Sequence, residues 1–284
     1  MGREVKTGKL SSNTHVLIGA GHMGGALLSG WLSGQGAGKL NAQEILVIDP
    51  SPGEAARKAL ELGAKFSTRL TKGAASGLKV CLLAIKPQIF SQVGPQIAQT
   101  LPKDTLVISI IAGISLEKLS KVLGTRPIIR AMPNTPAAYG QGITAYVCNS
   151  GVSKAQQSLA ELRLKAGGKV VEVESDKQID MVTAVSGSGP AYVFLLTETL
   201  QAAGEQIGLS MELSRKLARQ TVIGAGYMLG KTGSSAANLR KAVTSPNGTT
   251  EAALEILMDS NGLPPLMCRA VTVAYERSKA LGKG

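Results

Sequence analysis

The sequence predicts two domains: an α/β domain built on a mostly parallel sheet, followed by an all-α domain. Three observations support this fold class. The chain has 284 residues, which is long enough for two domains. From Thr14 to about Glu174, short apolar runs alternate with longer segments of helical spacing, the pattern of βαβ units. After about Ser175 the strand-like runs stop, and only helical patterns follow. We therefore expect domains at 14–174 and 175–284.

Seven short apolar runs are predicted to be strands of the first domain. They are β-branched or Leu-rich and mostly lack polar alternation, as expected for strands that are covered on both faces. The predicted strands are 16–18, 45–48, 80–85, 106–111, 128–132, 143–148 and 170–173. Between them, segments with helical spacing often open with Ser or Pro near the first turn. The predicted helices are 24–34, 52–62, 88–99, 115–123 and 153–165.

The second half contains helices that are too apolar for a monomer. The segment 190–207 is apolar around most of its circumference, whereas a helix with one face in water needs only one apolar stripe. In the next helix, 210–230, Gly224 and Gly226 suggest close packing against a neighbouring helix. A further amphipathic helix begins near Leu263. A second copy of the chain is the simplest partner for these surfaces, so we expect a homodimer.

Composition limits the classes of partner. Apolar residues make up 44% of the chain and charged residues 18%, which predicts a sizeable core rather than disorder. Lys and Arg (31) exceed Asp and Glu (19) by 12, a balance that favours anionic ligands. Only 3% of residues are aromatic, so the stacking platforms that bind single-stranded nucleic acid are missing. We expect no nucleic-acid partner.

Cysteine usage and the first residues predict the compartment. Cys81, Cys148 and Cys268 are odd in number and far apart, unlike a disulfide framework. Residues 1–13 carry charges but no apolar signal core, which predicts a flexible leader. A reducing, cytoplasmic location fits both observations.

Metal and membrane sites lack their usual signals. The only histidines are His15 and His22, and there is no Cys-x-x-Cys, so no metal site is expected. No uncharged apolar run approaches the roughly 18 residues that cross a bilayer, so no membrane partner is expected. Motifs of nucleophilic hydrolases are also missing from the sequence.

A glycine motif directly follows the first predicted strand and opens a helix. In a G-x-G-x-x-G of this kind, the first glycine allows a tight turn, the second lets the backbone approach a pyrophosphate, and the third lets helix and strand pack closely. The helix N-terminus adds unpaired amides for the phosphates. This context predicts a Rossmann-type, dinucleotide-binding domain. The predicted cofactor-binding residues are Ile18, Gly19, Ala20, Gly21, His22, Met23 and Gly24.

The turn after the second strand bears on the choice of coenzyme. Asp49 stands where an acidic side chain would bind the ribose 2′-hydroxyl of NADH and repel a 2′-phosphate. Ser51 in the same turn, with Arg57 further on, would instead suit the phosphate of NADPH. The residues favour NADH slightly and leave NADPH open.

Three other segments are predicted to lie at the carboxyl edge of the sheet, where doubly wound folds bind ligands. Lys86 would meet a phosphate or the nicotinamide ribose, and small residues after later strands would leave room for a flat ring. The first segment contains Ala84, Ile85, Lys86 and Pro87, and the other two are 111–113, with Ala112 as a predicted cofactor contact, and 132–136.

Two segments rich in Gly, Ser and Thr precede helices of the second domain. In 186–190 and 243–250, backbone amides can converge on an anion while the following helix adds its positive end. Helix capping alone would explain the first segment equally well. The second segment offers more hydroxyls than capping requires, which favours a small carboxylate ligand.

Together these motifs resemble the Δ1-pyrroline-5-carboxylate reductase family, which reduces 1-pyrroline-5-carboxylate to L-proline. The resemblance runs nearly end to end. The glycine motif is common to Rossmann proteins, but three other segments in this order are far more specific. They are the Met-Pro-Asn-Thr-Pro of 132–136, the Ser-Gly-Ser-Gly-Pro-Ala-Tyr of 186–192 and the Val-Thr-Ser-Pro-x-Gly-Thr-Thr of 243–250.

The resemblance implies a cofactor, a substrate site and an assembly. The cofactor would be NADPH or NADH, and the loop at 243–250 would hold the substrate carboxylate. Thr250 would be the catalytic residue, because its hydroxyl would touch the ring nitrogen and relay a proton. The interlaced helical domains would form a homodimer, with a decamer of dimers as a larger assembly. The implied substrate-binding residues are Ser245, Asn247, Gly248, Thr249 and Thr250.

Among the departures from the family pattern, two concern predicted site residues. Asn247 stands where the loop commonly has a glycine, and Asn tolerates the left-handed backbone that such a loop needs. Asp49 stands where many NADPH-using members have an uncharged residue.

Two other functions stay open at this point. One is a different small-imine or β-hydroxyacid dehydrogenase, although the segment 190–207 lacks the lysine that the β-hydroxyacid class usually needs. The other is a sensor that binds a dinucleotide without turning it over.

Overall fold

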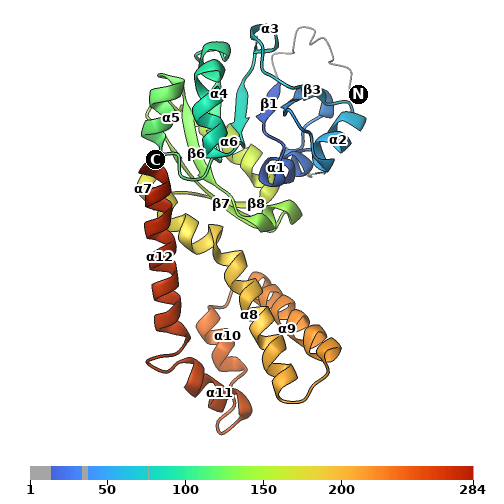
Figure 1. Cartoon of the computed structure of the whole chain (residues 1–284), viewed down its shortest axis with the longest axis vertical. Helices are drawn as coiled ribbons and strands as arrows, with labels where there is room; N and C mark the ends of the chain where they lie inside the picture. Colours follow the sequence, from blue (N-terminus) through green and yellow to red (C-terminus); the bar gives the residue numbers. More distant parts are fainter. Residues whose placement is uncertain (1–13, 34–37, 76, 284) are drawn as a thin grey trace. The chain divides into compact units, whose positions relative to one another are not determined.

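The computed structural model describes residues 14–33, 38–75 and 77–283. The predicted leader at 1–13 lies outside the described residues. By their contacts the described residues form two compact units, one comprising those of 1–187 and 275–283 and the other 188–274. Figure 1 shows a sheet with helices in the first unit and only helices in the second. Each unit is described separately.

The first unit is built on one eight-stranded sheet with the strand order β3-β2-β1-β4-β5-β6-β7-β8. Neighbouring strands are parallel except β6 and β7, which are antiparallel. The predicted mostly parallel sheet is thus confirmed. The strands are β1 (His15–Ile18), β2 (Ile45–Ile48), β3 (Lys65–Ser67), β4 (Val80–Leu83), β5 (Leu106–Ser109), β6 (Ile128–Met132), β7 (Gly142–Cys148) and β8 (Gly168–Glu172). Sequence reasoning missed β3, because its Lys-Phe-Ser is too short and polar to give an apolar run.

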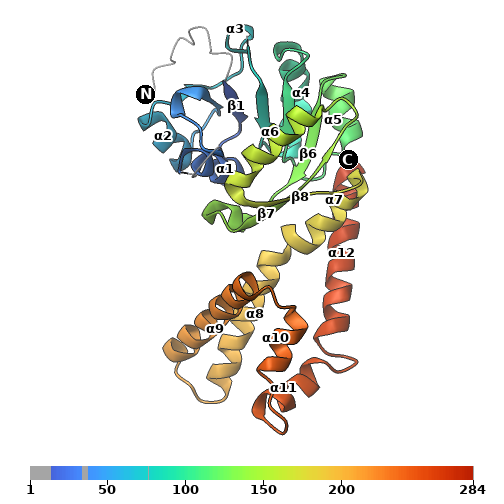
Figure 2. The same cartoon turned by 180° about the vertical axis from the view of Figure 1, so that it is seen from behind.

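Helices cover both faces of this sheet (Figures 1 and 2). Alternate residues of one strand enter opposite cores, because side chains of a strand point to opposite faces. Leu17 packs in the core on the face that carries the helices of 22–33, 54–61 and 154–164, whereas Val16 and Ile18 pack in the core on the face that carries those of 72–75, 87–100 and 116–123. This two-sided burial explains why the strands read as continuous apolar runs.

Helices α4, α5 and α6 of the first unit begin where the sequence signals place them. Ser115 and Ser153 cap α5 and α6 by accepting hydrogen bonds from backbone amides, and Pro87 occupies the first turn of α4. The helices are α1 (His22–Ser33), α2 (Glu54–Glu61), α3 (Lys72–Ala75), α4 (Pro87–Thr100), α5 (Leu116–Leu123), α6 (Lys154–Leu164) and α7 (Asp176–Val182). Short 3-10 turns are Ala42–Glu44, Thr135–Tyr139 and Lys165–Gly167.

The first unit extends beyond the predicted boundary at residue 174. Ile179 of α7 is buried in a small core with Ala145 and Val147 of β7, so this helix belongs to the sheet. A π-helical turn, Thr183–Gly187, follows α7 and ends the unit. The last residues, 275–284, also belong to it. The boundary differs because the sequence of a helix that packs on a sheet edge does not indicate which domain the helix belongs to.

The second unit is all helical, as expected, and leaves much of its apolar surface uncovered within one chain. Phe194 is 62% exposed, and α8 has no buried residue. A Cβ atom at Gly224 or Gly226 would meet nothing within 4 Å, so the predicted close helix contact there is wrong for the single chain. The helices are α8 (Gly189–Gln206), α9 (Met211–Thr232), α10 (Ala236–Ala242), α11 (Thr249–Leu257) and the first part of α12 (Leu263–Lys283).

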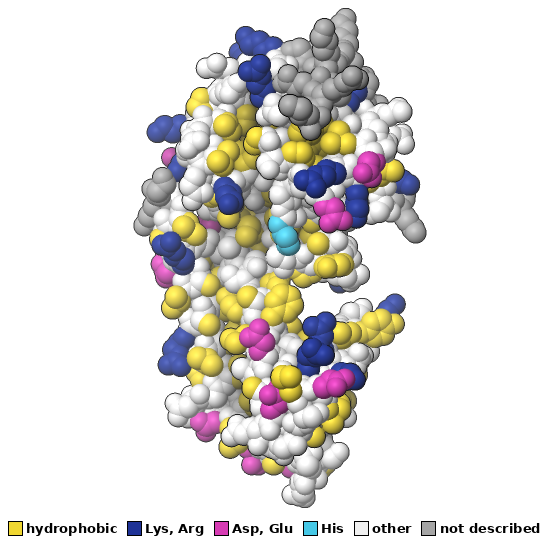
Figure 3. Space-filling model, turned by 45° about the vertical axis from the view of Figure 1, so that its right-hand side comes forward, with side chains coloured by type: hydrophobic (Ala, Val, Ile, Leu, Met, Phe, Trp, Pro, Cys, Tyr) yellow, Lys and Arg dark blue, Asp and Glu magenta, His cyan; other side chains and the backbone are white. Residues whose placement is uncertain are grey.

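One helical stretch, Asp176–Gln206, is long and apolar enough to cross a membrane by length and composition. The sequence search for uncharged runs did not anticipate it. Only 11% of the most apolar 18 residues of this stretch are buried within the single chain. An apolar helix that is covered by a protein partner also meets this criterion of length and composition. Figure 3 shows apolar side chains among charged ones on the visible surface.

Candidate active site

The glycine motif forms a tight connection between β1 and α1. Gly19 has a φ of 92°, and a Cβ there would lie 2.6 Å from the carbonyl oxygen of Ala84. A Cβ at Gly24 would lie 2.1 Å from the carbonyl oxygen of Gly19. Both contacts are far shorter than real Cβ atoms make, so these two positions require glycine for the turn and for the packing of α1.

Gly21 has a different environment. A Cβ there would meet nothing within 4 Å, and the residue is exposed. Packing within the chain therefore does not require glycine at this position. The absence of a side chain leaves the backbone accessible at the N-terminus of α1. This is the arrangement in which a pyrophosphate approaches backbone amides and the positive end of a helix. His22 and Met23 form the first turn of that helix.

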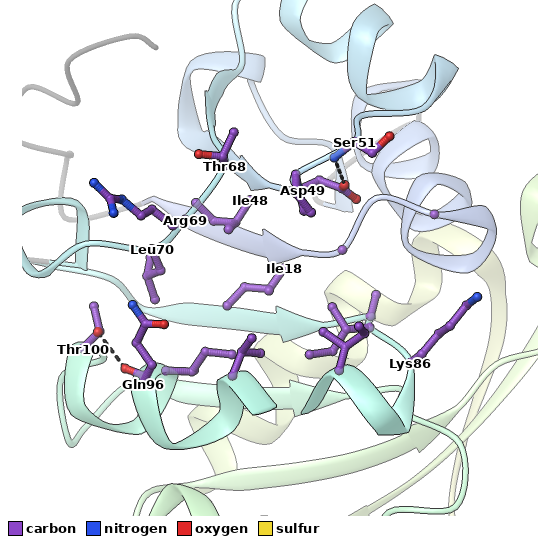
Figure 4. A pocket seen from close by; sticks show the side chains of 18 residues that line it. Ile18, Ile48, Asp49, Ser51, Thr68, Arg69, Leu70, Lys86, Gln96 and Thr100 are labelled. Carbon is purple, nitrogen blue, oxygen red and sulfur yellow. Dashed lines mark hydrogen bonds between the residues drawn. The ribbon is translucent and has the colours of Figure 1, made fainter. Parts of the chain in front are cut away.

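A cavity of about 650 Å³ lies beside this loop, and it is lined by the ends of β1, β2 and β4, the loop after β3, and α4. Figure 4 shows Ile18, Ile48 and Leu70 in the group, with Lys86 and Arg69 at opposite ends. Apolar walls with charged side chains at the ends suit a flat aromatic base and anionic groups on the same ligand. The residues thus fit a dinucleotide.

Asp49 holds the two sides of this pocket together. One carboxylate oxygen accepts a hydrogen bond from the Ala20 amide at 2.7 Å, and the other accepts one from the Ser51 amide at 2.8 Å. The side chain therefore fixes the glycine loop to the turn after β2. Each oxygen keeps a further lone pair, so this position can still meet a ribose hydroxyl.

The structure brings many of the predicted cofactor residues to one pocket. The predicted residues that line it are Ile18, Gly19, Gly21, Asp49, Ser51, Ala84, Ile85 and Lys86. Ala20, His22, Met23 and Gly24 lie in the adjoining loop and helix, and Pro87 begins α4. Ala112 does not line the pocket but is exposed after β5, at the same carboxyl edge.

Sequence reasoning missed the wall that β3 and α4 contribute. Thr68 and Arg69 follow β3, which gave no strand signal, so their place beside Asp49 could not be inferred. The α4 residues were visible as one face of a predicted helix, and their spacing was a usable signal. The missed lining residues are Ile48, Pro50, Thr68, Arg69, Leu70, Ile89, Val93, Gln96, Ile97 and Thr100.

In the second unit, the segment 243–250 forms a strained turn between α10 and α11. Asn247 is the one non-glycine residue with a positive φ among the described residues, at 55°. The expectation that Asn takes a left-handed conformation here is confirmed. Gly248 caps α11 with an extended backbone, and Thr249 and Thr250 form the first turn of the helix. Their amides lie at the positive helix end.

Two loop amides already have partners within the chain. Gly248 donates to the carbonyl oxygen of Ser245 at 3.0 Å, and Asn247 donates to the carboxylate of Glu251 at 2.6 Å. The Gly248 amide, which was expected to bind a ligand carboxylate, thus donates to a carbonyl oxygen within the chain. Glu251 was missed. An acid three residues after a helix cap is the signal of a capping box, but here its carboxylate accepts from Asn247, the residue before the cap.

Comparison with known proteins assigns the family. A family model described as pyrroline-5-carboxylate reductase dimerisation matches residues 176–281. The pyrroline-5-carboxylate reductase of Pseudomonas aeruginosa is 39% identical over 278 residues, which cover 96% of this chain and 98% of that protein. The chain belongs to the pyrroline-5-carboxylate reductase family. The reductase of Escherichia coli, 34% identical over 94% of this chain and 97% of its own length, agrees with this assignment.

Solved structures of pyrroline-5-carboxylate reductases share the whole fold. The enzyme of Coxiella burnetii is 36% identical, with a TM-score of 0.86 and coverage of 96% of this chain and all of that one. The Plasmodium falciparum pyrroline carboxylate reductase, solved with NADP bound, is 30% identical with a TM-score of 0.80, covering 97% of this chain and all of that one. A second family model, described as NADP oxidoreductase, coenzyme F420-dependent, matches residues 15–113, the part of this reductase that contains the glycine loop.

Proposed function

We propose that this reductase catalyses the NAD(P)H-dependent reduction of 1-pyrroline-5-carboxylate to L-proline, the last step of proline biosynthesis. The observation that carries the proposal is membership of the family over nearly the whole chain, including both the glycine loop and the loop at 243–250. The glycine loop and its pocket support the coenzyme part independently, because Gly21 is open where a pyrophosphate would approach.

The coenzyme site follows from the pocket residues. The α1 N-terminus and Lys86 hold the pyrophosphate, and the apolar walls hold the adenine ring. Ser51 and Arg69 are placed to bind a 2′-phosphate, whereas Asp49 favours a free 2′-hydroxyl. Bound NAD(P)H supplies a hydride to the imine carbon of the substrate. The protein therefore contributes mainly by positioning the coenzyme and the substrate, and such positioning can lower the activation barrier by about 7 to 11 kcal/mol.

The loop at 243–250 is the proposed substrate site. Ser245 and the amides of Thr249 and Thr250 hold the substrate carboxylate at the N-terminus of α11. The Thr250 hydroxyl contacts the ring nitrogen and donates a proton to it as the imine is reduced, and water returns a proton to the hydroxyl. Asn247 and Gly248 shape the turn that presents these groups, and their amides are fixed by Glu251 and by the carbonyl oxygen of Ser245.

The assembly we propose is a homo-oligomer built from homodimers, with a decamer as a larger form. The exposed apolar side chains of α8 and the match to a dimerisation family model support this. The location we propose is the cytoplasm, since all three cysteines are free.

One assay tests the function against its alternatives. Purified protein is mixed with 1-pyrroline-5-carboxylate and either NADPH or NADH, and oxidation of the nicotinamide is followed with proline as the expected product. Coenzyme binding without oxidation would favour a sensor. Oxidation with other cyclic imines or with β-hydroxyacids, but not with this substrate, would favour another dehydrogenase.

A further inference from the structure

Arg130 lies at the centre of a buried ion-pair cluster near the carboxyl edge of the sheet. It belongs to β6, and its side chain is 4% exposed. One guanidinium nitrogen donates to the Asp176 carboxylate and the other to the Asp180 carboxylate, each at 2.8 Å. Both acids belong to α7, the helix by which the chain leaves the first unit. The outgoing helix is thus bound at two points by one side chain.

The returning chain joins the same cluster. Ser278 of α12 is buried, and its hydroxyl donates to the same Asp180 oxygen that accepts from Arg130, at 3.1 Å. Near the end of α12, Leu281 lies within 3.4 Å of the position that a Cβ on Gly113 would take. The second unit, 188–274, is therefore connected to the first through two segments that share one carboxylate.

A second side chain of the same strand end holds the turn that follows α7. The amide group of Asn134 donates to the carbonyl oxygen of Ser186 at 3.1 Å, and its oxygen accepts from the Ile143 amide at 2.9 Å. Ser186 lies in the π-helical turn, where the usual helical hydrogen-bond pattern is shifted. Asn134 thereby ties that turn to β7.

We propose that Arg130 is a positioning residue of the reductase: through Asp180 it fixes the exit helix α7 and the return helix α12 together, the two segments by which the chain enters and leaves the unit that contains the loop at 243–250. This rests on the proposed function only for its kinetic consequence. Arg130 does not line the coenzyme pocket, so we expect its effect on the reaction to act through the two connecting segments.

Arg126 offers a matched control. It is also a buried arginine of the first unit, 5% exposed, just before the same strand. Its guanidinium donates only to backbone carbonyls of Ala98 and Leu101 near the end of α4, within the described contacts. Loss of its hydrogen bonds should lower stability without loosening either connection to the second unit.

The kinetic test compares Arg130→Lys with Arg126→Lys in the intact protein. For Arg130→Lys we expect kcat to fall about tenfold or more while the dissociation constant of NADPH changes by less than about twofold. For Arg126→Lys we expect a similar loss of melting temperature with kcat within about twofold of the parent. Equal losses of kcat in both variants, or no loss in Arg130→Lys, would overturn the proposal.

An activity-independent test uses hydrogen exchange. Arg130→Lys should raise the exchange of 176–187 and 275–283 together, by about tenfold, and leave β1 and β2 unchanged. Ser278→Ala, which removes only the hydroxyl that links α12 to Asp180, should raise exchange in the same two segments by less. Faster exchange in α7 alone, or in neither of the two segments, would show that the cluster does not couple the two connections. If the parent protein shows no reductase activity, the exchange test still decides the coupling.

Discussion

Asp49 has two roles with opposite consequences for the coenzyme. Its carboxylate fixes the glycine loop through the amides of Ala20 and Ser51, which favours binding of either coenzyme. The same negative charge lines the pocket that also contains Ser51 and Arg69, and it disfavours a 2′-phosphate. The preference between NADH and NADPH is therefore a balance between neighbouring side chains.

We predict that Asp49→Asn raises the ratio of kcat/KM for NADPH to that for NADH by about three- to tenfold. The amide removes the repulsive charge while its oxygen can still accept one backbone hydrogen bond. Steady-state kinetics with both coenzymes measures the ratio. Arg69→Ala is the companion variant and should lower it, because the attractive charge is lost. An unchanged ratio in both variants would mean that the 2′ position lies elsewhere.

Thr250→Ala should lower kcat by about 100-fold without weakening coenzyme binding, because the hydroxyl that relays the proton is lost. Thr250→Ser keeps the hydroxyl and should recover most of the activity. The measurements are steady-state turnover and NADPH titration by fluorescence. Thr244→Ala, in the same segment but with its hydroxyl donating to the Arg240 carbonyl, is the control. Full turnover in Thr250→Ala would remove this residue from the mechanism.

The glycine loop offers a sharper contrast, since two of its glycines exist for different reasons. Gly24→Ala should destabilise the fold by about 1 to 3 kcal/mol or more, because the new methyl group would overlap the Gly19 carbonyl. Gly21→Ala has free space and should leave the melting temperature nearly unchanged while weakening NADPH binding about tenfold or more. Calorimetry and coenzyme titration separate the two effects. Equal destabilisation by both would contradict the assigned roles.

Among the elements, β4 and β7 carry thiols that link stability to pH. Burial raises the pKa of Cys81 to about 12 and that of Cys148 to about 11, above the usual thiol value of 9.0. The folded state therefore keeps both protonated at a pH where the unfolded chain ionises them. Their contribution to stability is complete below about pH 8 and is lost progressively as the pH rises past about 9 toward the folded-state values.

Urea unfolding between pH 7.5 and 10.5 measures this dependence. We expect the free energy of unfolding to fall less steeply with pH when Cys81 and Cys148 are both replaced by Ala. Cys268→Ala, at an exposed position of α12, should leave the slope as in the parent. A double variant with the parental slope would refute the link.

The elements that sequence reasoning found and missed differ in a physical way. Central strands such as β1 and β5 were found because burial on both faces demands apolar residues at every position. The edge strand β3 and helix α7 were missed, because an edge strand needs few apolar contacts and α7 buries little more than Ile179. The coenzyme site was half predicted for the same reason: its glycine loop has a motif, while its β3 wall has none.

For the whole molecule, the two-domain architecture followed from the switch between strand and helix patterns near residue 175. The true division was not predictable, since it depends on long-range contacts such as that between Arg130 and Asp180. Such a pair has no periodicity or spacing in the sequence. The need for a partner was predictable, because apolar residues around a whole helix require cover.

We predict that Phe194→Asp shifts the protein toward the monomer, because it places a charge on the exposed apolar face of α8. Light scattering after size-exclusion chromatography measures the mass. Leu62→Asp is the matched control in the first unit, since Leu62 is 64% exposed and Phe194 62%. It should keep the parental mass. A change of mass in the control variant alone would place the subunit interface on the first unit.

The contribution of residues 275–283 to the first unit has a consequence for synthesis. A ribosome releases the sheet and its nucleotide pocket early, but Ser278, which closes the cluster around Arg130, emerges only after the entire helical unit. While the rest of the chain is translated, Asp180 in the N-terminal half therefore lacks its hydrogen bond from Ser278. Fusion tags or truncations at the C-terminus are thus expected to disturb the distant nucleotide-binding half, and tags are better placed at the N-terminus.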